Sequence, residues 1–332
     1  MGIALLAAPA PASAGVEPLV GSLHEHSGYS DGWPGSRPQT YFESGRSFGL
    51  DFMAGSEHSD NADLPLVASE YCLDPLVAPQ CLLADQFEPL NSFRKWDATL
   101  EQARAATTPA FTAFRGFEWS TDRFGHINVY FSRNDANAKG DGGYATMDAF
   151  YSWFTRAPSV DGGADGLATF NHPGAKSLHD DDPAFNWNDF AYVPQADTRM
   201  VGIEVFNDRR DYGTWYSHAL DRGWHLGAIG AEDLGHDRAD DWGGPTWPKT
   251  VVLAEDRSEP ALKAAMLARR FYAIRRPGIS LTYTADGRPM GSRVTRTEGK
   301  PAGISHTTRE HSRNGPRIPD TGSRVWAEAS TG

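Results

Sequence analysis

The residues best suited to chemistry near the N-terminus are imidazoles and carboxylates in the stretch GSLHEHSGYSDG. It contains His24 and His26 on either side of Glu25, followed by a tight Ser-Asp-Gly turn with Asp31. On a β-strand His24 and His26 point to one face and Glu25 to the other, because successive side chains alternate. Two imidazoles on one face of a strand end are half of a metal site. An isolated His-x-His is nevertheless a weak signal and is usually incidental.

The same combination recurs further along the chain. Residues 50–56 read as a buried strand that delivers Glu57 and His58 to its carboxyl end. Later apolar strands also carry an imidazole or a carboxylate at or near their ends, namely Glu118, His126, His172, Glu204 and Asp233. Ligand sites of α/β folds gather at the carboxyl ends of the strands, so we expect these groups to converge in space.

Predicted strands and helices alternate through most of the sequence. Further strands are predicted at 111–119, 125–131, 166–170, 200–206, 226–231 and 249–254, and helices at 38–48, 91–106, 146–156, 212–222 and 260–269. This alternation is typical of an α/β protein with a parallel sheet and crossover helices. Only the short loop STDRF separates 111–119 from 125–131, which favours a hairpin there.

Composition limits the possible partners. The 332 residues allow one large or two small domains, and a hydrophobic content of 39% is ample for a core. The formal charge of −12 argues against nucleic acid or an anionic membrane as a partner and suits a site that holds cations. After the N-terminal run, no segment is apolar and long enough to span a bilayer. We therefore expect a small-molecule substrate.

The two ends of the chain differ from its centre. Residues 1–14 resemble the second half of a secretory signal with an Ala-Ser-Ala cleavage pattern but no basic start, and a disordered Ala/Pro leader is the alternative. On the first interpretation the protein is exported, either secreted or periplasmic. Residues 287–332 are polar and basic, which predicts a disordered tail or a truncated second domain. Residues 15–286 remain as the main domain.

A proline-containing insert at 60–90 has loop-like composition and is predicted to be a lid or pocket wall. It carries both cysteines, Cys72 and Cys81. In an exported protein they can form a local disulfide, and two unpaired thiols are the alternative. Neither has metal-ligand spacing, so we place both outside the active site.

The ordered set of motifs resembles the PHP (polymerase and histidinol phosphatase) superfamily. The motifs are LHEHSGYSDG, GLDFMAGSEHSDN, GFEWS, GHINVYF, TFNHPG, IEVFN and IGAEDLGH, and the resemblance covers roughly residues 20–275. The export-type start and the loop lengths look most like the branch of metal-dependent phosphoesterases that includes a carbamate-insecticide hydrolase. The resemblance implies a distorted (β/α)7 barrel with a metal centre at the carboxyl ends of its strands.

The resemblance also implies metal ligands, residue by residue. Glu118 matches the glutamate that bridges the metals, and His172 matches a His-Pro motif. The implied ligands are His24, His26, Asp31, His58, Glu118, His126, His172, Asp233 and His236. Imidazole and carboxylate ligands suit Zn, Mn or Fe, and the lack of thiolates disfavours a closed structural zinc site. We expect two or three divalent ions.

This chain departs from the superfamily pattern at two positions. Glu57-His58 stands where Asp-His is usual. In the last motif His236 follows Asp233 by three residues, where the usual spacing is two. The ligands of a third metal are therefore left open.

The implied reaction is hydrolysis by a metal-bridging hydroxide, in which Glu118 holds the metals. His58 or His236 would protonate the leaving oxygen. Phosphate esters are the expected substrates, and carboxylic esters, carbamates or amides are the alternative. A secreted binding protein without turnover is a third interpretation, which the complete ligand set disfavours.

Other polar and aromatic residues have weaker signals. Glu204 lies within a strand and is predicted to orient a ligand histidine. Trp242 and Trp247 are predicted to cover the pocket, with a packed surface loop as the alternative. Four basic residues could bind phosphate, although a plain surface charge is the commoner role: Arg115, Arg123, Lys176 and Arg209. Three histidines are expected to be structural: His179, His218 and His225.

Overall fold

The computed structural model describes residues 15–33, 35–62, 95–139, 145–174, 186–233, 241–276, 278–292, 294 and 304–310. The N-terminal leader and most of the 60–90 insert lie outside these residues. The same holds for the individual residues Cys72, Cys81, Lys176, His179 and His236. Their predicted roles stay predictions.

One sheet has the strand order β12-β11-β1-β2-β4. Its strands are β12 (Phe271–Ile274), β11 (Lys249–Ala254), β1 (Glu17–Ser22), β2 (Phe52–Ala54) and β4 (Thr112–Phe114). The strands β1, β2 and β4 are parallel to one another, and β11 is antiparallel to both β1 and β12. Because β1 ends at Ser22, the next residues leave the sheet at its carboxyl end and carry His24 and His26.

The other large sheet has the order β10-β8-β7-β6-β5-β3, with β9 paired to β8. Its strands are β10 (Gly227–Ala231), β8 (Met200–Asn207), β7 (Leu167–Asn171), β6 (Gly125–Tyr130), β5 (Gly116–Thr121), β3 (Glu57–His58) and β9 (Arg210–Asp211). The predicted hairpin is confirmed, since β5 and β6 pair antiparallel. β6 is also antiparallel to β7, so the parallel sheet predicted from the alternation is only partly present and this sheet is mixed.

The single strand predicted at 111–119 is in fact divided at Arg115, and its halves belong to different sheets. The cause is close backbone packing at Gly116. A Cβ there would lie 2.6 Å from Val129 O and 2.7 Å from Gly55 O. The chain makes a similar crossing at Gly55, between β2 and β3. Both sheets are therefore mixed and are joined by strands that bend from one to the other.

The two sheets also meet at β10 and β11. Thr250 Oγ1 accepts a hydrogen bond from Gly230 N–H at 3.1 Å and donates one to Gly230 O at 3.0 Å. At the carboxyl end, Asp233 N–H donates to His24 O at 3.0 Å. Within the described residues the sheets nevertheless remain two separate ladders. The structure shows an α/β protein with mixed sheets, and a closed seven-stranded barrel stays an expectation.

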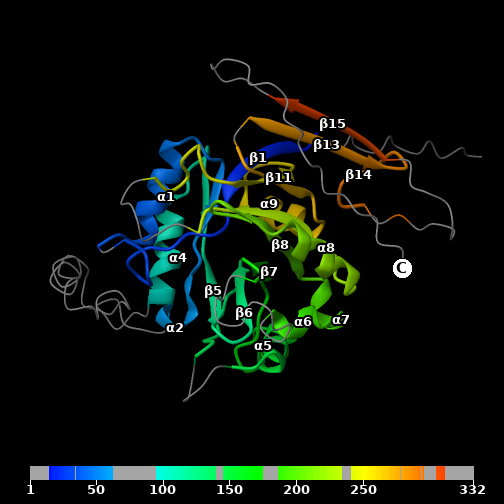
Figure 1. Ribbon diagram of the computed structural model, residues 1–332. Coiled ribbons are helices and arrows are strands. Elements are labelled where there is room, and N and C mark those ends of the chain that lie inside the picture. The colour runs from blue at the N-terminus through cyan, green and yellow to red at the C-terminus, as the bar shows by residue number, and fades with distance from the viewer. Residues whose placement is uncertain are drawn as a thin grey trace, which may run out of the picture.

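The longer helices cover the outsides of the sheets (Figure 1). They are α1 (Pro38–Ser47), α4 (Lys95–Ala106), α5 (Met147–Thr155), α8 (Gly213–Asp221) and α9 (Glu259–Leu267). Three single-turn helices are α2 (Ser59–Ala62), α6 (Trp187–Phe190) and α7 (Pro194–Asp197). Two starts have side-chain caps, because Thr146 and Ser258 each accept a hydrogen bond from the backbone N–H three residues on. In the part of the chain that is described, no helix is long and apolar enough to cross a membrane.

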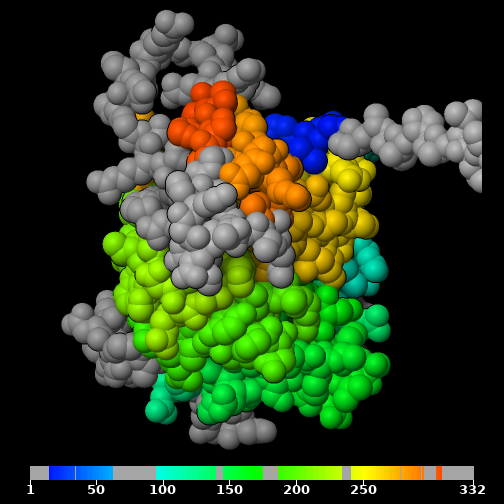
Figure 2. All heavy atoms as spheres, turned by 90° about the vertical axis from the view of Figure 1, so that its right-hand side faces the viewer, coloured from blue at the N-terminus to red at the C-terminus, as the bar shows by residue number. Residues whose placement is uncertain are grey.

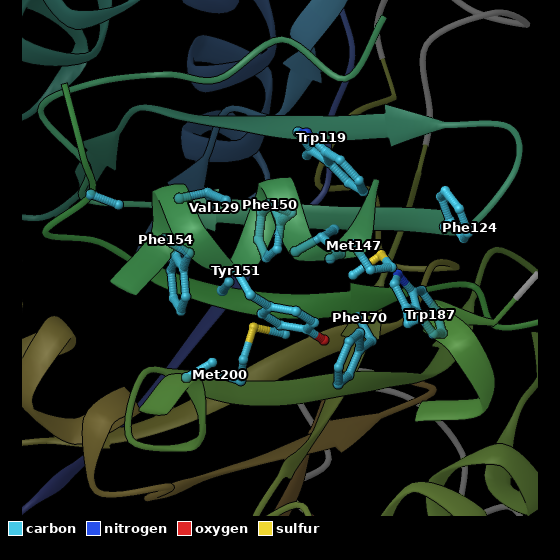
Figure 3. Packing of buried hydrophobic residues seen from close by; sticks show 14 of the residues in the cluster. Trp119, Phe124, Val129, Met147, Phe150, Tyr151, Phe154, Phe170, Trp187 and Met200 are labelled. Carbon is cyan, nitrogen blue, oxygen red and sulfur yellow. The ribbon is translucent and has the colours of Figure 1, made fainter. Parts of the chain in front are cut away.

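A large aromatic core lies between α5 and the strands β5 to β7 (Figure 3). Trp119 packs against Phe150 with ring centroids 4.9 Å apart. Because neighbours on a strand alternate faces, Phe117 and Trp119 enter this core while Glu118 points to the opposite side of β5. The aromatic packing thus determines where the carboxylate of Glu118 lies.

A small sheet near the C-terminus has the order β14-β13-β15 (Figure 2, orange and red). Its strands are β13 (Ile279–Ala285), β14 (Arg288–Pro289) and β15 (Ile304–Glu310). Leu281 N–H donates to the Tyr272 hydroxyl at 3.0 Å and ties this sheet to β12. β15 lies within the segment expected to be a disordered tail or a truncated domain, and which of these describes residues 287–332 stays a prediction.

Candidate metal centre

Glu118 lies at the middle of a cluster of imidazoles and is fully buried. Its oxygen Oε1 is 3.0 Å from His126 Nδ1 and 3.2 Å from both His24 Nε2 and His172 Nε2. Its other oxygen, Oε2, is 2.8 Å from His58 Nδ1. The two oxygens of one carboxylate thus face different imidazoles, which is the arrangement expected of a ligand that bridges two metal ions.

The orientation of His24 tests whether the cluster fits a metal. Glu204 Oε1 lies 2.6 Å from His24 Nδ1, so this nitrogen carries the hydrogen and Nε2 presents a lone pair. That lone pair faces Glu118 Oε1 at 3.2 Å and Asp233 Oδ1 at 3.4 Å. His26 Nε2 lies 3.0 Å from His24 Nε2. Acceptors this close need a shared proton or a cation between them, so the donor set fits a metal ion.

Several buried His, Glu and Asp side chains are arranged to hold metal ions. Within each of four overlapping groups the candidate ligand atoms lie within 4.8 Å of one another. The groups are His24/His26/Glu118, His24/His172/Asp233, His26/Asp31/His58 and His58/Glu118/His126. Of the nine predicted ligands, eight are therefore brought together, and His236 lies outside the described residues.

One side of the centre is more accessible than the other. The side chains of Asp31, Asp233 and His58 are 27%, 25% and 15% exposed, whereas that of Glu118 is completely buried. Asp31 Oδ2 lies 3.1 Å from His58 Nε2, and Asp31 Oδ1 lies 3.5 Å from His26 Nδ1. A substrate would therefore approach from the side that carries Asp31, His58 and Asp233.

The neighbouring charges shift pKa values in opposite directions. Burial alone would raise the pKa of Glu118, but His126 and His24 hold it well below its usual range. Burial alone would lower the pKa of His24, but the carboxylates led by Asp233 raise it well above its usual value. The carboxylates and imidazoles therefore stabilise each other's charged forms, and divalent ions would displace the protons that they share.

Glu204 orients two of the predicted ligands. Besides its contact with His24, its Oε2 accepts a hydrogen bond from His172 N–H at 2.7 Å. His172 has φ +29° and Asp233 has φ +52°, which residues other than glycine rarely adopt. Such backbone strain gathers where the surrounding contacts hold a functional residue in place.

Two amides complete the support of the carboxylates, and nothing in the sequence assigned them a role. Asn171 Nδ2 donates to Glu118 Oε1 at 2.9 Å. Asn207 Nδ2 donates to Glu204 Oε2 at 2.8 Å and to Asp233 Oδ2 at 2.9 Å. Each amide is the last residue of a buried strand, and the sequence motif of that strand also contains a residue of the metal centre. This position at a strand end is the signal in the sequence that could have identified them.

The predicted pocket tryptophans lie in different environments. Trp242 is buried, and its Nε1 donates to His26 O at 3.2 Å, so it supports the end of β1. Trp247 is partly exposed, with the Arg209 guanidinium 5.5 Å from its ring centroid. The prediction of a pocket cover stays a prediction for both residues.

The remaining predicted residues are accounted for by local contacts. The Arg115 guanidinium donates to the carbonyls of Trp96 and Arg133, which leaves phosphate binding to other residues. Arg123 is exposed in the turn after β5. The two described histidines expected to be structural each contact a carboxylate: His218 with Asp189 at 2.7 Å and His225 with Asp197 at 2.9 Å.

Comparison with known proteins adds evidence on the fold. No family model matches the sequence, and no curated protein matches it. A solved two-domain protein of Bacteroides vulgatus, described as containing a predicted PHP-like metal-dependent phosphoesterase, matches with a TM-score of 0.50 and 22% identity over 88% of this chain and 76% of that one.

Two further solved structures match at lower TM-scores. They are PsfC from Pseudomonas syringae, with a TM-score of 0.45 and 12% identity over 78% of this chain and 92% of that one, and an amidohydrolase from Chromobacterium violaceum, with 0.39 and 13% over 66% and 89%. None of these supports the carbamate-hydrolase-like branch. The chain thus has structural relatives of the PHP-like kind, and at this identity the likeness concerns the fold alone.

Proposed function

We propose that the protein is a metal-dependent hydrolase of phosphate esters. The observation that carries the proposal is Glu118, whose two oxygens face separate imidazoles at the accessible end of the sheets. Divalent ions held there would supply Lewis acidity and activate water for attack. Glu204 fixes the rings that would bind them, through His24 Nδ1 and His172 N–H.

His58 is the candidate proton donor to the leaving oxygen. Burial alone would lower its pKa, but Asp31 and Glu118 raise it well above the usual value. Its side chain is 15% exposed and lies on the accessible side of the centre. One nitrogen of this partly exposed imidazole would bind metal, and the other would carry the hydrogen that protonates an alkoxide or phenoxide as it leaves.

Two residues of the β9 segment support an anionic substrate. Arg210 pairs with Asn207 across the strands, and residues directly opposite each other point to the same face. Asn207 donates to Asp233, so Arg210 stands opposite a residue that supports the metal centre. Burial raises the pKa of Tyr212 to about 12, and Arg210 opposes that rise, so the two side chains lie close together. A cation and a phenol beside the centre suit the spread negative charge of phosphoryl transfer.

The description of the Bacteroides vulgatus relative as containing a phosphoesterase supports the same choice. The alternative is a carbonyl substrate, which activated water can also attack. The partly exposed Trp247 ring favours an aryl group in such a substrate. The metal ligands would suit either reaction, so a comparison of phosphate-ester and carboxylic-ester substrates must decide between them.

The test compares p-nitrophenyl phosphate with p-nitrophenyl acetate at saturating Mn²⁺ or Zn²⁺. We expect hydrolysis of the phosphate ester and loss of it in His172→Ala. Arg210→Ala should raise KM for the phosphate roughly tenfold, the loss of one charge-assisted contact, and leave acetate hydrolysis unchanged. A kcat/KM for acetate at least about tenfold above every phosphate mono- and diester tried would favour the carbonyl reaction instead.

A further inference from the structure

We propose that Glu57 is a positioning residue that holds Asp31 in place and is not itself a metal ligand. The proposal rests on the metal-dependent function proposed above. It concerns the position at which the chain has Glu-His where Asp-His is usual in the resembling superfamily. It assigns Glu57 to the assembly of one part of the centre, the group His26, Asp31 and His58.

Strand geometry separates the two residues of this pair. In the parallel pairing of β3 with β5, Glu57 stands opposite Phe117 and His58 opposite Glu118. Successive side chains alternate faces, so His58 faces the centre with Glu118 while Glu57 leaves on the other face. Glu57 is buried, and among the described residues it belongs to no group able to hold a metal.

Three hydrogen bonds to the Glu57 carboxylate come from a single turn. Its Oε1 accepts hydrogen bonds from Ser27 N–H at 3.1 Å and Ser27 Oγ at 2.6 Å. Its Oε2 accepts one from Ser30 Oγ at 2.5 Å. The turn closes on itself, because Gly32 N–H donates to Ser27 O at 2.8 Å. Glu57 therefore holds the residues that immediately precede Asp31.

A second buried charge holds the same turn from another side. Lys95, on α4, is 1% exposed, and its Nζ donates to Tyr29 O at 2.7 Å. The turn is also tight, since a Cβ on Gly32 would lie 2.5 Å from Ser27 Cα. With its backbone held on both sides, the turn presents Asp31 to His58 Nε2 at 3.1 Å. One strand step thus supplies His58 on one face and the support for Asp31 on the other.

The reach of the glutamate is the property to test. Replacing it with aspartate withdraws the carboxylate by about 1.5 Å, the length of one carbon–carbon bond. The hydrogen bonds to the Ser27 and Ser30 hydroxyls would then be broken while the negative charge remains. Glu57→Gln keeps the reach and removes the charge. It still accepts through its carbonyl oxygen, and the serine hydroxyls can turn to accept from its amide.

The experiment is metal titration of chelator-treated full-length protein with Mn²⁺ by calorimetry, with elemental analysis after desalting. We expect Glu57→Asp to lose one ion per chain, or to bind the weakest ion about 10–100-fold less tightly, with the other ions unaffected. Glu57→Gln should weaken the binding of that ion less than Glu57→Asp does. Ser27→Ala removes one donor and should weaken the same ion, and its effect should not add to that of Glu57→Asp because both act through one contact.

Asp51→Asn is the matched control. Its carboxylate also accepts a backbone hydrogen bond, from Val20 N–H at 2.9 Å, and one from Arg257 Nε at 3.0 Å, but it lies before β2 at the other end of that strand. It should lower the melting temperature and leave metal stoichiometry unchanged. If Glu57→Asp binds metal as the wild type does, or loses all ions equally, the positioning role is wrong. If the wild type binds no divalent ion, the proposed function fails along with it. Should Glu57→Asp not fold, Ser27→Ala decides alone.

Discussion

The residues that follow β1 separate two buried polar clusters of opposite character. On one side His24 and His26 face the metal centre. On the other Glu25 lies with Glu232 and Lys249, which we call the acid–lysine cluster, and all three are at most 1% exposed. Burial and charge therefore do not distinguish the two clusters. Their balance of hydrogen-bond donors and acceptors does.

The acid–lysine cluster contains its own cation, although Glu25 Oε2 and Glu232 Oε1 have no hydrogen-bond partner among the described residues. Lys249 Nζ forms an ion pair with Glu232 Oε1 at 2.7 Å and donates hydrogen bonds to Gly244 O at 2.8 Å and to Trp247 O at 3.1 Å. Gly243 N–H donates to the second oxygen of Glu232 at 2.8 Å. In the metal centre, by contrast, the acceptor atoms of carboxylates and imidazoles face one another and share protons. A ligand site is thus recognised by acceptors that converge without a permanent cation, whereas the acid–lysine cluster contains one.

Carboxylates of the two clusters have pKa shifts of opposite sign. Burial, reinforced by Glu232, raises the pKa of Glu25 well above its usual value, and burial also raises that of Glu232. The pKa values of Glu118 and Asp233 are held well below their usual ranges by the imidazoles around them, although burial opposes this. The metal centre is therefore arranged to keep its carboxylates charged and able to bind cations.

The largest expected effect is that of Glu118→Gln. Removing the charge at the middle of the centre should abolish metal retention and activity, because both oxygens of the carboxylate face imidazoles that would hold metal. Glu204→Gln is the matched variant. Glu204 orients ligands without facing the ions, so the expected loss is about 10–100-fold. Elemental analysis and kcat/KM measure both, and equal losses with metal retained would contradict a bridging Glu118.

Lys249→Met should have the next largest effect, and on stability alone. It leaves the buried carboxylate of Glu232 without its partner, which typically costs about 3–5 kcal/mol. Metal content should be unchanged. Chemical denaturation measures the first quantity and elemental analysis the second, and a variant that loses metal while keeping its stability would show that the clusters are not distinct.

The same variant has a predictable pH dependence. Lys249 lowers the pKa values of Glu25 and Glu232, so removing it raises them further. A carboxyl group whose pKa is higher in the folded state contributes stability below its unfolded pKa and loses it as pH rises through the folded pKa. The stability deficit of Lys249→Met relative to wild type should therefore be largest at neutral pH and shrink as pH falls toward 4.5, the usual glutamate value.

Local patterns were sufficient to predict much of the fold and of the centre. The strand predicted at 249–254 is confirmed as Lys249–Ala254, and that at 200–206 extends by one residue to Asn207. Apolar runs and their ends are properties of neighbouring residues, so the placement of ligands at strand ends could be read directly. The matching of His24 and Asp233 to one centre also needed the expectation that strand ends converge.

What could not be predicted depends on partners distant in the chain. The break at Arg115 follows from the backbones of Gly55 and Val129 packing against Gly116, and no local pattern contains them. Asn171 supports Glu118 across 53 residues of sequence. Trp242 reads locally as part of a surface loop, yet it donates to His26 O from 216 residues away. Side-chain hydrogen bonds of this kind become visible only when the strands are placed in space.

The smallest expected effects come from two buried hydroxyls, one in each cluster. Ser120 Oγ lies 2.5 Å from His58 Nδ1 and donates to Glu118 O at 2.8 Å, whereas Ser22 Oγ donates to Glu25. Ser120→Ala should weaken metal binding about tenfold, because it frees the ring of a ligand histidine. Ser22→Ala should cost about 1 kcal/mol of stability, the usual value of one hydrogen bond, and leave metal affinity unchanged.

Both substitutions remove one oxygen from a buried site, so their direct packing costs are similar. A difference between the two variants in metal affinity or stability therefore reports the hydrogen bonds that each hydroxyl makes. Metal titration and thermal unfolding of the two variants give four numbers. If Ser22→Ala weakens metal binding as much as Ser120→Ala does, the two faces of the β1 end are coupled through the backbone of residues 24–26. The distinction between the metal centre and the acid–lysine cluster would then fail for this protein.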